Sequence, residues 1–342
     1  MKTRAWRLAP ALACLLATAG AMAVPSTQFS LTGAVNSPAV FDLAALQALP
    51  ALTQTVSYTA GGVPQTRTYV GTSLWGLIDG AGIVTNPTPN NDILNRYVLA
   101  TGSDGYKIVF SLGELNPLFG NRPDLVAYGE VVGGVMQGLG ADGFARVTAP
   151  GDIRGGRYVS NLVSLDVRAS GSTQLGTGGG VSTSFSVSGA VTAPRSFDLA
   201  ALQALPSVTR VVGGVSYQGV SFWDLLNSAV GIPVTPGVNN DILGKYVVAT
   251  GSDGYRALFS MGELNTNFGN QPDIIAFAAD GVPLTGNGFA RIVVPGDDRR
   301  GRWVSNLVSL EVFSASPVPE PAAWMLALAG LSGLAIARRR PA

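Results

Sequence analysis

Phe41-Asp-Leu-Ala-Ala-Leu-Gln-Ala-Leu-Pro50 occurs twice in this chain, and the second occurrence, at residues 197–206, is identical. Shorter stretches on both sides of it recur in the same order: residues 29–35 at 185–191, 90–94 at 239–243, 101–106 at 250–255 and 159–165 at 304–310. Each copy spans about 130 residues, which is enough for its own core and much longer than a solenoid repeat. The sequence therefore predicts two tandem globular domains.

Hydrophobic periodicity within one copy predicts mixed strands and short helices. Asp42 is positioned to cap a helix that Pro50 ends, and Ser103-Asp-Gly105 is a hairpin turn, because Asp and Gly tolerate positive φ. The other segments follow no strand-helix-strand rhythm, so we expect an α+β class that is rich in strands. The expected strands are 29–35, 53–58, 67–70, 97–100, 106–110, 125–128, 145–148 and 159–167, and the expected helices are 43–49, 73–79 and a turn at 113–115.

Composition divides the chain into five parts. Residues 169–184 are mostly Gly, Ser and Thr, which is typical of a flexible linker. We expect a signal peptide at 1–23, the first copy at 24–168, this linker, the second copy at 185–314 and a sorting tail at 315–342.

The N-terminus has the pattern of a secretory signal peptide. Lys2, Arg4 and Arg7 precede an apolar stretch that ends in Ala21-Met-Ala23. Small residues at Ala21 and Ala23 suit a signal peptidase, so we expect cleavage before Val24. The alternative is an uncleaved membrane anchor.

The C-terminus has three parts in a fixed order: Val318-Pro319-Glu320-Pro321, an apolar segment at 322–337, and three arginines at 338–340. The arginines would stay cytoplasmic under the positive-inside rule. This order resembles the PEP-CTERM sorting signal, which implies recognition by an exosortase and release to the surface or to an extracellular matrix. Until then the tail would contact the inner membrane as a single apolar helix. A plain C-terminal anchor is the alternative.

Charge and residue types exclude several functions. Removing the three N-terminal cations, the three terminal arginines and Glu320 from totals of 22 Lys plus Arg and 21 Asp plus Glu leaves 16 cations, 20 anions and a net charge of −4. That balance argues against nucleic-acid binding, which needs clustered cations. The chain has no histidine, and its one cysteine, Cys14, lies in the signal peptide. Ser-His-Asp and Cys-His catalysis and the usual zinc sites are therefore excluded.

A second resemblance covers nearly all of each copy. Ser103-Asp-Gly-Tyr106, Arg146-Val, Pro150-Gly-Asp152 and Arg154-Gly-Gly-Arg157 have counterparts in the second copy. This set resembles the molybdopterin-binding domain of the sulfite oxidase family, which implies that fold and a molybdenum ligated by a protein cysteine. In this chain Tyr58 or Thr59 stands where that cysteine is expected, and the corresponding stretch of the second copy is shortened to 211–214. Soft thiolate ligation is thus lost in both copies, and with it the oxo-transfer chemistry.

The candidate ligand-binding residues are the polar ones of what remains of the pterin cleft. They are Asp104, Tyr106, Arg146, Asp152, Arg154 and Arg157, with Asp253, Tyr255, Arg291, Asp297, Arg299 and Arg302 in the second copy. The aspartates and arginines also have a purely structural interpretation. An aspartate followed by glycine, as in Asp104-Gly105, can form a turn, and the arginines can form internal ion pairs. We expect Glu114 and Glu263 to be helix-end or solvent-facing carboxylates, with no catalytic acid pair.

Together these patterns favour an exported, surface- or matrix-sorted protein with two non-catalytic oxidoreductase-like domains that act as a binding or structural module. Expected partners are the signal peptidase, the exosortase, and an extracellular polysaccharide or a small anion, with no cofactor. The alternative is a molybdopterin-dependent oxidoreductase with atypical ligation. Ice or carbohydrate adhesion is a third hypothesis, but the sequence has no flat threonine array to support it.

Overall fold

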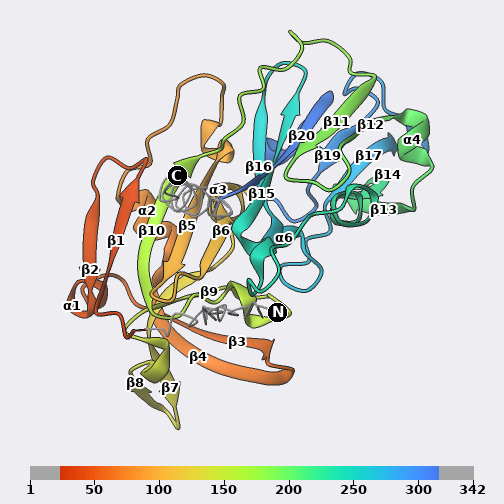
Figure 1. Ribbon diagram of the computed structural model, residues 1–342. Coiled ribbons are helices and arrows are strands. Elements are labelled where there is room, and N and C mark those ends of the chain that lie inside the picture. Colours follow the sequence, from red (N-terminus) through yellow and green to blue (C-terminus); the bar gives the residue numbers. More distant parts are fainter. Residues whose placement is uncertain (1–23, 316–342) are drawn as a thin grey trace, which may run out of the picture.

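The computed structural model describes residues 24–315, and the expected signal peptide and sorting tail lie outside this range. Two halves of similar architecture lie side by side, with the short helices α3 and α6 near their junction (Figure 1). Each half contains two five-stranded sheets. The chain is therefore rich in strands, and its elements recur in the same order in both copies.

The first sheet of copy 1 joins the beginning and the end of the copy. Its order is β2-β1-β10-β5-β6, and the β1–β10 pair is parallel while the others are antiparallel. Its strands are β1 (Gln28–Gly33), β2 (Ala39–Asp42), β5 (Arg96–Gly102), β6 (Lys107–Ser111) and β10 (Leu162–Ala169).

The second sheet contains the middle of the copy. Its order is β3-β4-β7-β8, with β9 paired to β7. Its strands are β3 (Leu52–Ala60), β4 (Val63–Ser73), β7 (Leu125–Val132), β8 (Val135–Gln137) and β9 (Arg146–Thr148). The loop after β9 and the β3–β4 hairpin lie at the edge of the candidate functional site.

The helices are short and begin at side-chain caps. Asp42 accepts a hydrogen bond from the Ala45 N–H at 2.8 Å, and Ser73 caps the next helix in the same way. The helical segments of copy 1 are α1 (Leu43–Gln47), α2 (Leu74–Gly80) and α3 (Leu112–Leu115), with 3₁₀ turns at η1 (Asp92–Asn95), η2 (Gly140–Asp142) and η3 (Gly155–Arg157).

Copy 2 repeats this plan with two differences. Strand β13 of its hairpin is three residues shorter than β3 and β14 is four residues shorter than β4, and the helix that matches α2 becomes α5 followed by a π-helix. Its elements are β11 (Ser184–Gly189), β12 (Arg195–Asp198), α4 (Leu199–Gln203), β13 (Ser207–Val212), β14 (Val215–Ser221), α5 (Phe222–Asp224), η4 (Leu225–Val230), η5 (Asp241–Gly244), β15 (Lys245–Gly251), β16 (Arg256–Ser260), α6 (Met261–Leu264), β17 (Ile274–Ala279), β18 (Val282–Pro283), β19 (Arg291–Val293), η6 (Arg300–Arg302) and β20 (Leu307–Ser314).

The predicted elements agree with the structure in order and type. Every expected strand and helix is present, although β4 and β7 are longer than expected and β2 and β8 were not foreseen. Both are short strands whose exposed residues give a weak apolar pattern. The turn at 103–105 joins β5 to β6 as predicted, with Gly105 at φ +82°.

The linker is packed against copy 2, which corrects the expectation of flexibility. The Ser172 hydroxyl donates to the Glu311 carboxylate, and the Thr177 N–H donates to the Ser252 carbonyl at 2.8 Å. Gly176 lies so close to residues 251–254 that a Cβ would be 2.4 Å from the Ser252 oxygen. Low hydrophobicity therefore did not exclude order, because the small residues allow close backbone contact.

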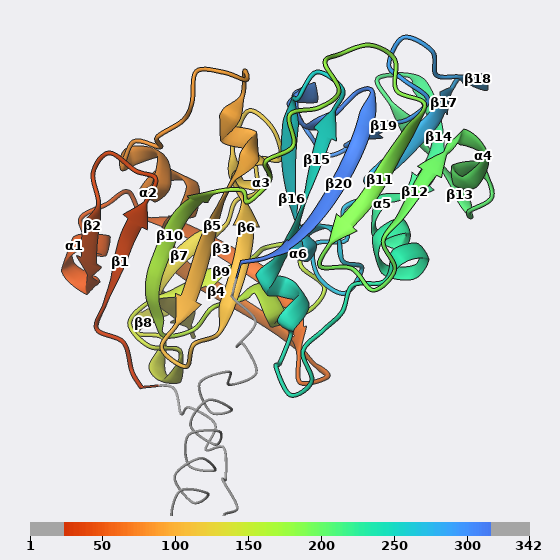
Figure 2. The same ribbon diagram turned by 45° about the horizontal axis from the view of Figure 1, so that its top comes forward.

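A third apolar cluster joins the copies, in addition to one core in each. It lies between the β5–β6 and β15–β16 strand pairs, which face each other across the junction (Figure 2). Tyr97 and Tyr246 are its matched centre, with ring centroids 4.7 Å apart. Each copy also donates one backbone hydrogen bond to a phenylalanine carbonyl of the other, from Ile153 to Phe268 and from Asp298 to Phe119.

None of the helices within residues 24–315 has the length and apolar character needed to cross a membrane. The predicted cleavage site and the Val318–Pro321 motif lie outside the described residues, so they stay predictions.

Arg157 of copy 1 packs against α6 of copy 2, and Arg302 packs against α3 in the same way, so a small change in one of these helices tests the interface. A Cβ on Gly262 would lie 2.4 Å from Cδ of Arg157, whose guanidinium is fixed by ion pairs. Gly262→Ala should therefore lower the free energy of unfolding by about 1–3 kcal/mol through overpacking, although alanine is by itself the better helix former.

Gly80→Ala is the matched control, since Gly80 also lies in a helix and has nothing within 4 Å of its added Cβ. Urea unfolding of both variants measures the difference. Equal stability of the two variants would contradict this account of the junction.

Candidate functional site

Two capping boxes meet at the junction of the copies. In α3 the Glu114 N–H donates to the Ser111 hydroxyl at 2.9 Å, while the Ser111 N–H donates to the Glu114 carboxylate at 2.8 Å. Ser260 and Glu263 do the same in α6, at 3.0 and 2.7 Å. Ser-x-x-Glu is the sequence signature of this motif, and it occurs at matching positions of both copies.

The two boxes are also bonded crosswise. The Ser111 hydroxyl donates to Oε1 of Glu263, and the Ser260 hydroxyl donates to Oε1 of Glu114, both at 3.0 Å. The glutamates are 1% and 0% exposed. They are helix-end carboxylates, as one of the two expectations had it, and the solvent-facing alternative is wrong because the other copy covers the helix ends.

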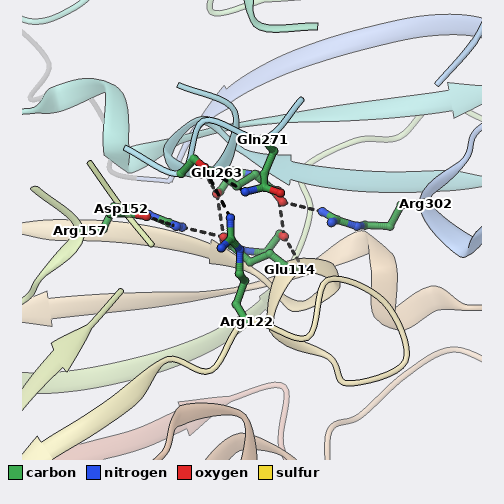
Figure 3. Close-up of polar contacts among 10 residues, drawn as sticks. Glu114, Arg122, Asp152, Arg157, Glu263, Gln271 and Arg302 are labelled. Atoms are coloured by element: carbon green, nitrogen blue, oxygen red, sulfur yellow. Dashed lines mark hydrogen bonds and ion pairs between the residues drawn. The ribbon is translucent and has the colours of Figure 1, made fainter. Parts of the chain in front are cut away.

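Two arginines complete this arrangement from opposite sides (Figure 3). Arg157 donates to Glu114 at 2.6 Å and makes two bonds of 2.8 Å to Asp152. In copy 2, Arg302 pairs in the same way with Glu263 and Asp297. The structure thus places four predicted site residues, Asp152, Arg157, Asp297 and Arg302, in internal ion pairs and not in a ligand cleft.

The interface cluster contains more carboxylates than cations. Besides the four ion-paired acids it includes Asp124 and Asp273, each 2% exposed, whose carboxylate oxygens have no hydrogen-bond partner within the described residues. The nearby guanidiniums are those of Arg157, Arg302 and Arg122. Six acids therefore face three cations in a dry environment.

Burial changes the protonation of this cluster. Desolvation raises the pKa of Asp124 and of Asp273 well above the usual range, despite the opposing field of the arginines. Desolvation and the neighbouring Glu114 also raise the pKa of Glu263 to about 7, although Arg302 opposes the shift. These carboxyl groups therefore ionise less readily than in water, which lessens the repulsion between the copies.

Two matched clefts lie on the surface beside this interface. The cleft of copy 1 has a volume of about 250 Å³ and that of copy 2 about 300 Å³. The first is lined by Asp104, Tyr106, Gly155, Gly156, Tyr158, Ser160, Asn161, Asn239 and Asn240. The second is lined by Asn91, Asp253, Tyr255, Arg300, Gly301, Trp303, Ser305 and Asn306.

Each cleft is completed by an asparagine of the other copy. Tyr106 donates to the Gly156 carbonyl at 2.6 Å and accepts from the Asn240 amide at 2.9 Å. Tyr255 donates to the Gly301 carbonyl at 2.6 Å and accepts from the Asn91 amide at 3.2 Å. Burial raises the pKa of Tyr106 to about 12, so this hydroxyl stays protonated. Four predicted site residues, Asp104, Tyr106, Asp253 and Tyr255, therefore line clefts that both copies build.

The two aspartates of these clefts also form the predicted turns. Asp104 accepts a hydrogen bond from the Tyr106 N–H at 2.9 Å, and Asp253 accepts one from the Tyr255 N–H at 3.0 Å. The structural and ligand-facing interpretations are thus compatible, because one carboxylate oxygen holds the turn while the side chain borders the cleft.

Arg146 is neutralised behind the cleft of copy 1. It is 7% exposed, forms an ion pair with Asp142 and donates to the Tyr69 hydroxyl at 3.1 Å. Its guanidinium lies 5.3 Å from the centroid of Tyr158. Tyr58, from the long hairpin, stacks on the same Tyr158 ring at 4.3 Å.

Arg291, its counterpart, has no such carboxylate. Asn287 occupies the position of Asp142, and the buried Nε of Arg291, like that of Arg146, has no hydrogen-bond partner in the described part of the chain. Burial lowers the pKa of Arg291, and Arg300 lowers it further, although Tyr217 opposes the shift. Both guanidiniums lie against Trp303, at 5.1 and 4.9 Å from the ring centroid.

The remaining candidates, Arg154 and Arg299, are exposed on the loops before η3 and η6 and line neither cleft. Arg300, one residue further on, lines the cleft instead.

The residues present do not fit a molybdenum cofactor held by a protein thiolate. At the expected ligand position Tyr58 is 8% exposed, packed on Tyr158 and within 3.2 Å of the Tyr69 hydroxyl. Thr59 joins the neighbouring loop through its N–H, which donates to the Ile153 carbonyl at 2.9 Å. Residues 24–315 contain no cluster of three His, Cys, Asp or Glu side chains arranged to hold a metal.

Four features of the site were not foreseen as functional. Asn91 and Asn240 belong to a repeated Asn-Asn-Asp-Ile-Leu stretch, which signals a matched role in both copies but not which copy each residue contacts. Arg300 and Trp303 replace Gly155 and Tyr158, a difference that aligning the two copies reveals.

Comparison with known proteins gives little. No family model matches the chain, and a search of curated proteins found no similar sequence. Among solved structures it is similar to the sulfane dehydrogenase SoxCD from Paracoccus pantotrophus, at 16% identity and a TM-score of 0.35, over 87% of this chain and 80% of that one. A likeness at this level says nothing about the activity or cofactor of this chain.

The excess of buried acids predicts a pH dependence of stability. A carboxyl group whose pKa is higher in the folded than in the unfolded state stabilises most below its unfolded value, and this contribution is lost as the pH rises toward the folded value. For Asp124, Asp273 and Glu263 the pKa is raised. The free energy of unfolding should therefore fall as the pH rises from about 5 to about 8.

Asp273→Asn should flatten this fall and stabilise the protein at the alkaline end by about 1–3 kcal/mol relative to wild type, since a neutral amide replaces a buried carboxylate without donors. Asp79→Asn, at an exposed helix position, is the control and should keep the wild-type slope. Chemical unfolding across this pH range measures both, and an unchanged slope in Asp273→Asn would refute the account.

Proposed function

We propose that this protein is an exported, non-catalytic binding module of the cell envelope or extracellular matrix, whose two clefts hold a hydroxylated ligand such as a polysaccharide. The observation that carries the proposal is the construction of each cleft from both copies, through the Asn240–Tyr106 and Asn91–Tyr255 contacts. Two equivalent clefts in one chain suit a repetitive polymer, because linked sites raise the effective affinity.

The chemistry of the clefts supports a sugar-like ligand. A pyranose ring has apolar C–H faces, which pack against aromatic rings, and hydroxyl edges, which need both donors and acceptors. Tyr158 and Trp303 border the clefts with 5% and 6% of their surface exposed, and the polar lining, which includes Ser160 and Asn239 in one cleft and Ser305 and Asn306 in the other, supplies both kinds of hydrogen-bonding group. A reactive constellation would need a nucleophile beside a base, and the glutamates that could form an acid pair are sealed inside the interface.

The address belongs to the same proposal. A signal peptide cleaved after Ala23, followed by exosortase recognition of Val318–Pro321, would deliver the protein to the surface, where polysaccharides are present. The copies would then be cofactor-free relatives of the sulfite-oxidase-type domain, with Tyr58 filling the place of the metal ligand in copy 1. The molybdoenzyme alternative is not favoured, because no soft ligand stands at that position.

Binding by the purified full chain tests this function. Isothermal titration with a neutral glucan and with polygalacturonate should show saturable binding of at least one polymer. Asn91→Ala combined with Asn240→Ala should weaken it about tenfold, because each lost amide contributes to a cleft. Asn36→Ala, at an exposed turn outside both clefts, is the control.

Two results would overturn the proposal. The first is the absence of binding to any tested polysaccharide. The second is stoichiometric molybdenum in the protein purified from its native envelope, measured by elemental analysis, which would instead support the enzyme.

A further inference from the structure

The two clefts share their position and most of their lining, yet they differ in charge. In copy 1 the local groups are Arg146, Asp142 and Asp104, so carboxylates outnumber guanidiniums. In copy 2 they are Arg291, Arg300 and Asp253, so guanidiniums outnumber carboxylates. The difference comes from two exchanges between the copies, Asp142 to Asn287 and Gly155 to Arg300.

Within residues 24–315, neither the Arg291 nor the Arg300 guanidinium forms an ion pair with a carboxylate, whereas Arg146 is paired with Asp142. The two cations share one aromatic ring and repel each other, which the lowered pKa of Arg291 reflects after burial. A bound anion between or beside them would remove this repulsion.

The hairpins decide which cleft is open to such an anion. In copy 1 the long β3–β4 hairpin carries Tyr58 over Tyr158, and a Cβ at Gly155 would lie 2.8 Å from the Tyr58 ring. In copy 2 the shorter hairpin turns at Gly213, where an added Cβ would lie 3.6 Å from the Arg300 guanidinium. Arg300 therefore takes the place that Tyr58 fills in copy 1.

The geometry points to the copy 2 cleft as a subsite for the carboxylate of an acidic sugar residue, with Arg300 as the direct ligand and Arg291 as a second positive charge against the Trp303 ring. This inference rests on the proposed polysaccharide binding and adds the class of sugar and the copy that recognises it. A guanidinium fork matches a carboxylate in planar, two-bond geometry. The Trp303 Nε1 is engaged with the Val294 carbonyl at 3.1 Å, so the ring is held in place before a ligand arrives.

Two variants follow from the comparison of the copies. Arg300→Gly installs the residue that copy 1 has at the same turn, so the backbone is compatible with it, and it should weaken polygalacturonate binding at least about tenfold. Asn287→Asp restores the carboxylate that pairs with the arginine in copy 1. It should weaken binding about two- to fivefold with almost no change in shape.

Arg195→Ala is the matched control. Arg195 also stacks on an aromatic ring of copy 2, at 4.7 Å from the Phe197 centroid, but lines neither cleft. Its removal should leave polygalacturonate affinity unchanged, and circular dichroism with thermal unfolding should confirm that all three variants are folded.

The outcomes separate the two proposals. Tighter binding of polygalacturonate than of neutral glucan, lost in Arg300→Gly and reduced by added salt, is the expected result. Equal binding of both polymers with no effect of Arg300→Gly would overturn the acidic-sugar inference and leave the binding function standing. If sodium acetate at equal carboxylate concentration competes with polygalacturonate, the cleft recognises a small anion and not an acidic sugar. This result would also overturn the acidic-sugar inference. Failure to bind either polymer would overturn the binding function itself.

Discussion

Glu114 and Glu263 lie buried at the junction of the two copies, each bonded to the serine that begins the other copy's helix. Two carboxylates in this position are tolerated because Arg157 and Arg302 pair with them from opposite sides. Separating the copies would break the two crosswise Ser–Glu hydrogen bonds, while the ion pairs of Glu114 with Arg157 and of Glu263 with Arg302, each within one copy, would lose the cover of the other copy. The relative position of the two copies follows from this constraint.

The clefts depend on that position. Asn91 and Asn240 lie on loops of one copy but bond to tyrosines of the other, so neither cleft is complete in a separate domain. The two clefts of the duplicated domain are therefore not independent sites, because each copy supplies part of the other copy's cleft. A ligand that needs the amide groups would sense whether the copies are associated.

After duplication the copies kept the interface and changed the clefts. The serines, glutamates, aspartates and arginines of the junction are the same in both, while a hairpin shortened and Gly155 has Arg300 as its counterpart. In copy 1 Tyr58 covers the Tyr158 ring beside the cleft, and in copy 2 two guanidiniums without an ion pair among residues 24–315 lie against Trp303. This division favours one copy that mainly supports the structure and one that contacts a charged ligand.

The sequence alone predicted the repeat, the order of strands and helices and the turn at Asp104, because periodicity, caps and turn residues act over a few neighbours. It also excluded histidine chemistry from the chain and thiolate chemistry from the residues that follow Cys14. The fate of the twelve candidate polar residues depended on tertiary structure. The same Arg-x-x-Arg pattern contains an exposed Arg154 and a fully buried Arg157, and sequence does not distinguish them. Burial, ion pairing and access to a cleft are set by residues distant in the chain, here by the opposite copy, and they decide whether a charge holds the protein together or is free to bind.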